Sequence, residues 1–144
     1  MKSLFFVFLA IVFVVFVYFT FKSKTVVKKV VIGNITIEAE VADTAPKKIK
    51  GLMFRESLAE ENGMLFLFDD DGYHAIWMMN MSFPIDIVWI NSDYKIVDIV
   101  KDAQPCKIFC PSYKPKEKAR YVIEVNAGFT DKHSIKIGDK VKIY

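Results

Sequence analysis

The stretch that decides the fold is GLMFRESLAEENGMLFLFDDDGYHAIWMMNMSFPID, residues 51–86. Its centre, MLFLF at 64–68, is a wholly apolar run that follows an Asn-Gly turn, and this pattern predicts a strand buried on both faces. Residues 74–81 and 83–90 predict two further strands around the short segment MSFP. Both faces of 83–90 are apolar except at Asp86, so the predicted sheet has to accommodate a carboxylate in its interior.

Short apolar runs and turn residues continue on both sides of this stretch. Two runs flank Gly33-Asn34, which is a hairpin signal. Residues 44–50 predict a short helix that Asp43 or Thr44 caps and Gly51 ends. Further strands are predicted at 94–100, 121–125 and 135–144, with a turn or short helix at 127–134. Residues 30–144 are thus expected to be mainly β (α+β at the margin), a small β-barrel or sandwich-like domain of about seven to nine strands with one or two short helices.

The N-terminus predicts a membrane anchor. Leu4 to Phe21 is a run of 18 residues without a charge, and as a helix it would span ~27 Å, close to the thickness of the hydrocarbon core. A cleaved signal peptide is the alternative, but FKSKTVVKK follows the run and offers no small-residue cleavage site. We therefore divide the chain into an anchor with a basic linker, 1–29, and one domain, 30–144, and expect a single-pass membrane protein.

Charge limits the partners of this domain. Residues 1–29 carry five lysines and no acidic residue, so residues 30–144 hold 15 basic and 17 acidic residues, a net charge of −2. The basic cluster lies next to the predicted anchor and suits anionic lipid headgroups. A domain without a basic surplus is not expected to bind DNA or RNA.

Several motifs carry a resemblance to a known family. GLMFR at 51–55, NGMLFLF at 62–68, IWMMNM at 76–81, PIDIVWI at 84–90, YVIEVNAGF at 121–129 and IKIGDKV at 135–141 occur in the family's order and spacing. The chain, over roughly residues 34–144, resembles uncharacterised protein family 0127, also called domain of unknown function 192. The resemblance implies a compact, mostly β domain, often exported or membrane-tethered, with no established activity. The motif positions that we single out are Gly51, Met53, Gly63, Met64, Trp77, Met78, Pro84, Asn126 and Gly128.

Two carboxylates in apolar strands are the most informative polar residues. Asp86 and Glu124 each sit among apolar neighbours, and an unpaired carboxylate there costs several kcal/mol or has a raised pKa. Arg55 and Asn80 are the expected partners of these carboxylates, which gives one polar cluster of Arg55, Asn80, Asp86 and Glu124. Such a cluster either fixes strand register and loop position or forms a small-ligand pocket or acid–base pair. We favour the first role, because no nucleophile or third catalytic group accompanies the four residues.

No metal or cofactor is predicted. Trp77 to Met81 is rich in thioethers, which suit Cu(I), but Met commonly fills core gaps beside aromatic residues, and the family pattern has Lys at position 79 and Thr at 81. Asp69 to Gly72 lacks the spacing of an EF-hand and predicts a solvated turn.

Cys106 and Cys110 are separated by three residues. This spacing suits a local structural disulfide, with free thiols or an intermolecular bond as alternatives, and no second Cys or His pair completes a zinc site. A disulfide would favour an extracytoplasmic domain, as does the family resemblance. The lysines that follow the anchor favour the cytoplasm instead, so the orientation stays open, with the outward one preferred.

Two classes of function remain. The first is a membrane-anchored, non-enzymatic binding or scaffolding module at the cell envelope, with an unidentified small ligand or protein as its partner. The second is an envelope enzyme or small-ligand sensor that uses the cluster of Asp, Glu, Arg and Asn. A deep polar pocket beside these residues would favour the second class, and a closed hydrogen-bond network would favour the first.

Overall fold

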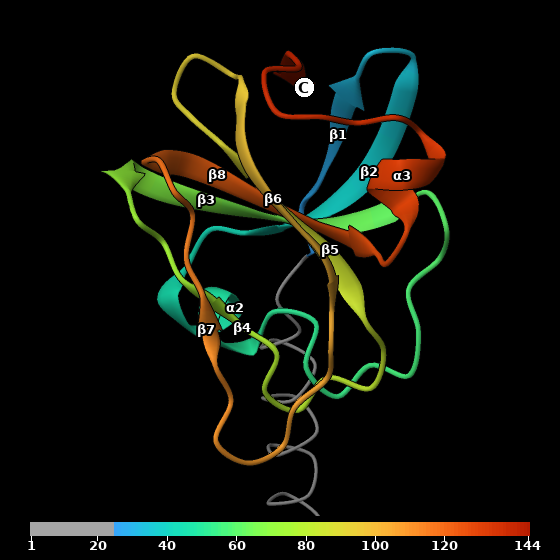
Figure 1. Ribbon diagram of the computed structural model, residues 1–144, viewed down its shortest axis with the longest axis vertical. Coiled ribbons are helices and arrows are strands. Elements are labelled where there is room, and N and C mark those ends of the chain that lie inside the picture. The colour runs from blue at the N-terminus through green and yellow to red at the C-terminus, as the bar shows by residue number, and fades with distance from the viewer. Residues whose placement is uncertain (1–24) are drawn as a thin grey trace, which may run out of the picture.

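A curled seven-stranded sheet with the order β6-β5-β8-β3-β2-β1-β9 frames residues 25–144, the part of the chain that this computed structural model describes (Figure 1). The strands of this sheet are β1 Val27–Ile32, β2 Ile35–Ala42, β3 Asn62–Gly72, β5 Ile85–Ile90, β6 Ile96–Ala103, β8 Ala119–Asn126 and β9 Val141–Ile143. Backbone hydrogen bonds from Ile96 to Asp139 and from Gly138 to Ile96 join the start of β6 to the turn before β9. The two edges of the sheet thereby approach each other and form a half-barrel.

A second layer covers one end of the half-barrel. It consists of helix α2 Ala45–Lys50 and a two-stranded sheet of β4 Ile76–Trp77 and β7 Ser112–Tyr113; these elements lie together in the lower part of Figure 1. A short helix, α3 Phe129–Lys132, follows β8. β2 and β3 are parallel neighbours, and parallel neighbours need a crossover connection. α2 belongs to that crossover, which explains its place over the end of the sheet.

The sheet separates two hydrophobic cores because successive strand residues face opposite sides. All six residues of β5 are buried: Ile85, Ile87 and Trp89 join the core on the α2 side, whereas Val88 and Ile90 join the other core. The predicted apolar character of both faces of this strand is therefore confirmed.

Most predicted elements are present within residues 25–144. These residues contain nine strands and two short helices, so the mainly β prediction is confirmed. β1 and β2 pair across the Gly33-Asn34 turn with Ile32 opposite Ile35, as the hairpin signal predicts. α2 starts after Thr44 and ends at Gly51.

Two predicted strands are shorter than expected. Residues 74–81 form only β4, because Met78 and Asn80 direct their backbone groups to Cys106 and Asn80 adopts a positive φ of 55°. Residues 135–144 form only β9, because a turn at Lys136–Asp139 precedes it, in which the Lys136 N–H donates to the Asp139 side chain. Side-chain alternation does not reveal either turn.

The predicted anchor, Leu4 to Phe21, lies outside the described residues. Within residues 25–144, no helix has the length and hydropathy needed to cross a bilayer.

Candidate ligand cleft

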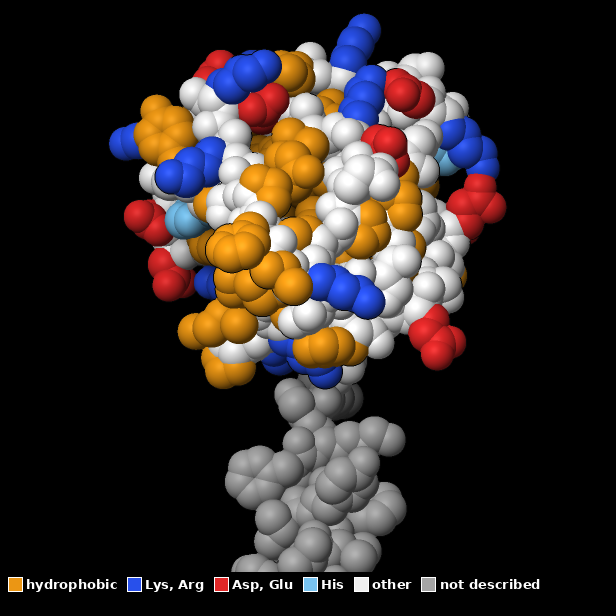
Figure 2. Space-filling model, turned by 60° about the horizontal axis from the view of Figure 1, so that its bottom comes forward, with side chains coloured by type: hydrophobic (Ala, Val, Ile, Leu, Met, Phe, Trp, Pro, Cys, Tyr) orange, Lys and Arg blue, Asp and Glu red, His pale blue; other side chains and the backbone are white. Residues whose placement is uncertain are grey.

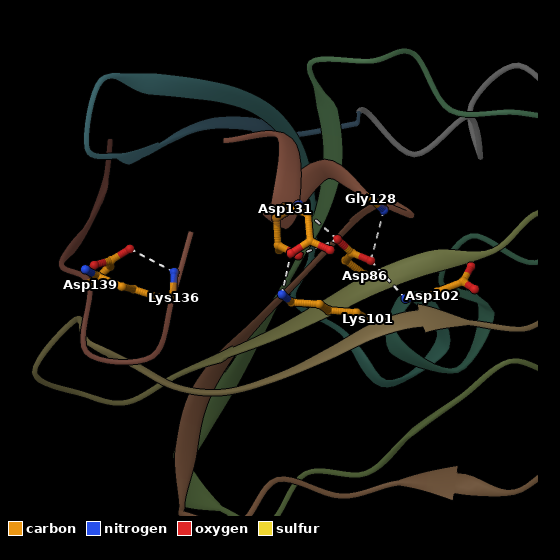
Figure 3. A network of polar contacts seen from close by, with 8 residues as sticks. Asp86, Lys101, Asp102, Gly128, Asp131, Lys136 and Asp139 are labelled. Atoms are coloured by element: carbon orange, nitrogen blue, oxygen red, sulfur yellow. Dashed lines mark hydrogen bonds and ion pairs between the residues drawn. The ribbon is translucent and has the colours of Figure 1, made fainter. Parts of the chain in front are cut away.

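Asp86 lies at the centre of a closed hydrogen-bond network. Its side chain is buried, and Oδ1 accepts the backbone N–H groups of Asp102 at 3.0 Å and Gly128 at 3.2 Å. Oδ2 accepts the Thr130 N–H at 2.9 Å and the Thr130 hydroxyl at 2.6 Å. Figure 3 shows the carboxylate on the α3 side, with an ion pair between Lys101 and Asp131 beside it. With two donors on each oxygen, Asp86 ties β5 to the loop end of β6 and to α3.

The four predicted cluster residues do not form one cluster. Asp86 is opposite Val125 and Ile87 is opposite Glu124 in the β5–β8 ladder, so the two carboxylates point to opposite faces of the sheet. Asp86 belongs to the α3 face, and Glu124 belongs to the α2 face. The expected contact between Asp86 and Arg55, Asn80 or Glu124 is therefore wrong: sequence spacing does not show which of two neighbouring strand positions face each other.

Asn80 contributes its backbone rather than its side chain. Its N–H donates to the Cys106 carbonyl at 2.9 Å, and its carbonyl accepts the Phe54 N–H at 3.0 Å. Its positive φ, which Asn tolerates better than most residues, allows both contacts. Asn80 thus joins the segment after α2 to the loop that carries the cysteines.

Glu124 is buried, and within the described residues one of its carboxyl oxygens has no hydrogen-bond partner. It is 4% exposed, and its Oε2 makes no hydrogen bond within the described part of the chain. Burial raises the pKa of Glu124 to about 8, against a smaller lowering by the positive charge of Arg55. The side chain therefore carries a proton at neutral pH, and one of its oxygens has no partner.

Arg55 instead pairs with Glu40 of β2. Nη1 and Nη2 donate to Oε1 and Oε2 of Glu40 at 2.6 and 2.7 Å, a bidentate pair that is half-buried. The hydrogen bonds from Arg55 hold the pKa of Glu40 below its usual value. Glu40 is absent from the predicted cluster, although the alternation in 35–41 places it on the polar face of its strand, where a partner on the crossover can reach it.

Three adjacent hollows surround α2, and together we call them the α2 cleft. The innermost, of about 50 Å³, is lined by Glu124, Gly51, Phe66 and Trp77 among others. A second, of about 230 Å³, shares Lys50 and Gly51 with it and contains the Arg55–Glu40 pair. A third, of about 280 Å³, shares Phe66 and Trp77 with the first and adds Phe68. Glu124 therefore lies at the floor of a cleft with an aromatic wall on one side and an ion pair on the other.

Two motif glycines shape this floor. Gly51 ends α2 with a φ of +48°, and a Cβ there would come within 3.3 Å of the Phe66 ring and 4.0 Å of the Glu124 Oε2. A Cβ at Gly63 would lie 2.8 Å from the backbone oxygen of Glu124. Larger side chains would thus close the floor or push β3 away from β8.

The remaining motif positions are mostly structural. Met53, Met64 and Met78 are buried, and the Pro84 carbonyl accepts the Ala127 N–H. The Asn126 amide donates to the carbonyls of Leu58 and Ala59, which holds the loop before β3. The Gly128 N–H is one of the donors to Asp86. Trp77 differs from the rest: it is 41% exposed at the rim of the α2 cleft.

The predicted disulfide between Cys106 and Cys110 is present, with the Sγ atoms 2.17 Å apart. His74 stacks on Phe68 with ring centroids 3.6 Å apart, and Met81 is buried in the core on the α2 side. Within residues 25–144, no group of three His, Cys, Asp or Glu side chains is placed to hold a metal ion.

Comparisons with known proteins agree on one family. The family model described as "Uncharacterized ACR, COG1430" matches residues 27–143. The UPF0127 protein of Pyrococcus horikoshii is 28% identical over 110 residues, which cover 73% of this chain and 86% of that protein. The UPF0127 protein of Thermococcus gammatolerans is 32% identical over 102 residues, which cover 71% of this chain and 63% of that protein.

Two crystal structures share the fold. One is a protein of unknown function from Novosphingobium aromaticivorans, with 31% identity, a TM-score of 0.75 and coverage of 82% of this chain and 84% of that one. The other is a candidate transcription regulator from Sinorhizobium meliloti, with 28% identity, a TM-score of 0.76 and coverage of 85% and 97%. The family model spans nearly all of the described domain and the sequence motifs lie within it, so the chain belongs to uncharacterised protein family 0127, the domain of unknown function 192.

Proposed function

We propose that this chain is a non-enzymatic ligand-binding module and that the α2 cleft is its ligand site. The observation that carries the proposal is the unpartnered Oε2 of Glu124 at the floor of the cleft. A buried polar atom without a partner costs on the order of 1–3 kcal/mol. Such a cost is commonly retained at functional sites. Asp86, by contrast, has all its hydrogen bonds and needs no ligand.

The lining of the cleft defines the chemistry of the ligand. Protonated Glu124 offers one O–H donor and one carbonyl acceptor. Phe66, Phe68 and Trp77 supply an aromatic wall that suits an apolar body. We therefore expect a small amphipathic molecule with one polar group, a hydroxyl, an amide or a carboxyl group, that reaches Glu124.

Binding fits this cleft better than catalysis does. Nη1 and Nη2 of Arg55 engage both carboxylate oxygens of Glu40, and Glu124 has no hydrogen-bonded base or nucleophile beside it within the described residues. A general acid needs a partner group that accepts or attacks in the same step. A lone neutral carboxyl group instead suits recognition.

We also propose that the module is tethered to a membrane with its domain outside the cytoplasm. The uncharged run Leu4 to Phe21 supports the tether, and the Cys106–Cys110 disulfide supports an oxidising compartment. The net charge of −2 over residues 30–144 speaks against a role in transcription like the one suggested for the Sinorhizobium meliloti protein.

The binding proposal is tested with three six-carbon probes that differ only in their polar group: hexanol, hexanamide and hexanoic acid. Ligand-observed NMR with the full chain in lipid nanodiscs measures their affinities against Glu124→Met, which keeps the bulk but removes the polar group. We expect the affinity of the best probe to fall about tenfold, the value of one hydrogen bond to a buried group. Asp93→Ala, a change at an exposed turn, is the matched control. Affinities equal to those of the wild type, or no binding by any of the three probes, would contradict the proposal.

A further inference from the structure

Five large apolar side chains are exposed on α2, on the segment after it, on β4 and on the cysteine loop, and together we call them the apolar end. They are Ile49, Phe54, Trp77, Ile108 and Phe109, with exposed fractions between 41% and 99%. Figure 2, in which this end of the domain comes forward, shows hydrophobic side chains gathered in one patch with basic side chains beside it. A contiguous exposed apolar patch marks an interaction surface.

The five side chains come from separate segments that the fold fixes together. Ile49 and Trp77 line the same hollow beside α2. The backbone contacts of Asn80 with Phe54 and Cys106 join the segment after α2 to the cysteine loop. The disulfide closes that loop at residues 106–110, and its tip presents Ile108 and Phe109, the latter 99% exposed. The patch is therefore preformed rather than assembled on binding.

The position of the chain's first described residue identifies what this surface meets. Thr25 lines the α2 cleft together with Lys50 and Arg55. Residues 22–24 separate it from the uncharged run Leu4 to Phe21, and the four backbone steps from Phe21 to Thr25 span at most ~14 Å. The end of that run therefore lies within this distance of Thr25, and Thr25 lines the cleft.

The charges around the apolar end match a bilayer surface. Lys47, Lys48 and Lys50 lie in α2, and Lys107 is exposed in the cysteine loop. Lysines beside exposed aromatic and aliphatic side chains are typical of surfaces that lie in the headgroup region. Trp in particular favours the membrane–water interface.

We propose that the apolar end docks on the lipid bilayer, with Trp77, Ile108 and Phe109 at the boundary between headgroups and acyl chains. This inference rests on the membrane tether proposed above. It adds a defined orientation: the α2 cleft faces the lipid, and an amphipathic ligand enters it from the membrane interface rather than from water.

The test uses the full chain in phosphatidylcholine vesicles whose lipids are brominated near the start of the acyl chains, because bromine quenches tryptophan fluorescence on contact. Trp89 is buried and donates to the His74 carbonyl, so Trp77 is the ring within lipid reach. We expect brominated lipid to quench the Trp77 emission, because a ring at the interface contacts the start of the acyl chains, and Trp77→Phe to abolish this component. With Trp77→Phe as background, Phe109→Trp restores quenching.

The matched control is Ile137→Trp in the same background. Ile137 is exposed, and its turn is bonded to the start of β6, at the end of the half-barrel away from α2. We expect no quenching at this position. Equal quenching at positions 109 and 137 would overturn the docking proposal. A blue-shifted emission of Phe109→Trp that depends on the protein density in the vesicles and not on bromine would also overturn it, because it would show that a second copy of the chain covers this surface.

Vesicle flotation separates the two proposals. A chain that fails to float with the vesicles contradicts the tether, and docking with it. A chain that floats without quenching at positions 77 and 109 overturns docking alone and leaves the tether standing. Far-ultraviolet circular dichroism of each variant confirms that the β-rich fold is retained before quenching is compared.

Discussion

At the scale of single residues, the two buried carboxylates carry opposite roles. Asp86 and Glu124 sit in neighbouring strands and have equally apolar neighbours in the sequence. The fold gives Asp86 four donors, three of them backbone N–H groups that no side-chain pattern announces. It gives Glu124 a cavity and an unpaired oxygen. The first stabilises the domain, and the second is the residue available to a ligand.

Asp86→Ala is expected to lower the free energy of unfolding by about 3–5 kcal/mol, because it leaves the donors of three residues, Asp102, Gly128 and Thr130, without an acceptor. Urea denaturation followed by tryptophan fluorescence measures the change. Asp93→Ala, which removes an exposed carboxylate, is the control and should change stability by less than about 0.5 kcal/mol. A similarly small effect of Asp86→Ala would mean that the network of Figure 3 does not hold α3 in place.

Glu124 predicts a pH dependence of stability. Its pKa is about 8 in the folded domain, above the value of about 4.3 for an unfolded chain. Between these values the folded state binds a proton that the unfolded state does not, so stability falls as pH rises from about 4.3 to about 8, by a total of about 5 kcal/mol. Glu124→Gln cannot ionise, so the difference in unfolding free energy between wild type and this variant should follow that curve. A difference independent of pH would refute the raised pKa.

Substitutions in the Arg55–Glu40 pair should shift the pKa of Glu124 in opposite directions. The positive charge of Arg55 lowers the pKa of Glu124, so Arg55→Gln is expected to raise that pKa further. Glu40→Gln removes the anion that balances Arg55 and is expected to lower it. Carbon-detected NMR of the Glu124 carboxyl group across pH measures both shifts. Shifts of the same sign in the two variants would contradict an electrostatic coupling through Arg55.

The sequence identified Asp86, Glu124 and Arg55 as informative, but Asp86 bonds to none of the predicted partners and Arg55 acts on Glu124 only through its charge while it binds Glu40. A charged residue in an apolar strand can be recognised from the sequence alone, because its neighbours in the sequence are apolar. Its partner is not visible, because neighbouring positions of β5 and β8 send their side chains to opposite faces. Glu40 is the actual partner of Arg55. It lies in a strand whose alternation indicates one buried face and one solvated face, and the sequence places Glu40 on the solvated face.

At the scale of elements, local signals proved reliable where turn chemistry and alternation agree. The Gly33-Asn34 hairpin, the helix ended by Gly51 and the doubly buried β5 follow from such signals. The shortening of β4 and β9 does not, because it depends on contacts of Asn80 with Cys106 and on the turn at Lys136–Asp139. The order of the seven strands depends on contacts distant in sequence, such as the parallel pairing of β2 and β3.

Within the cysteine loop, the disulfide is expected to act locally. Replacement of both cysteines by serine removes a cross-link that closes a loop of about five residues, for which chain entropy gives a loss of about 2 kcal/mol. Hydrogen exchange should show faster exchange near residues 106–110 and little change in β5 or β8. Loss of protection throughout the half-barrel would show instead that the loop supports the whole domain.

At the scale of the whole molecule, the structure puts three features at one end: the first described residue, the α2 cleft and the apolar end. The opposite end carries the β5–β6 turn and the C-terminus (Figure 1). The sequence does not indicate this difference between the two ends, because the exposed apolar residues are scattered from Ile49 to Phe109 along the chain. Only the fold shows that the first described residue, Thr25, and the proposed ligand site share a side.

The last prediction concerns the side of the membrane on which the domain lies, which we propose to be the outer side. If the domain lies outside the cytoplasm, a protease added to intact cells digests it. In that case Cys106 and Cys110 are also oxidised in the cell, because disulfides persist in oxidising compartments. A maleimide reagent added to denatured protein that has not been reduced should therefore label neither cysteine. A variant without residues 1–24, held in the cytosol, is the control, and both cysteines should be labelled there. Protection from protease together with labelled thiols in the full chain would place the domain in the cytoplasm, where the lysines at 22–29 would then follow the positive-inside tendency.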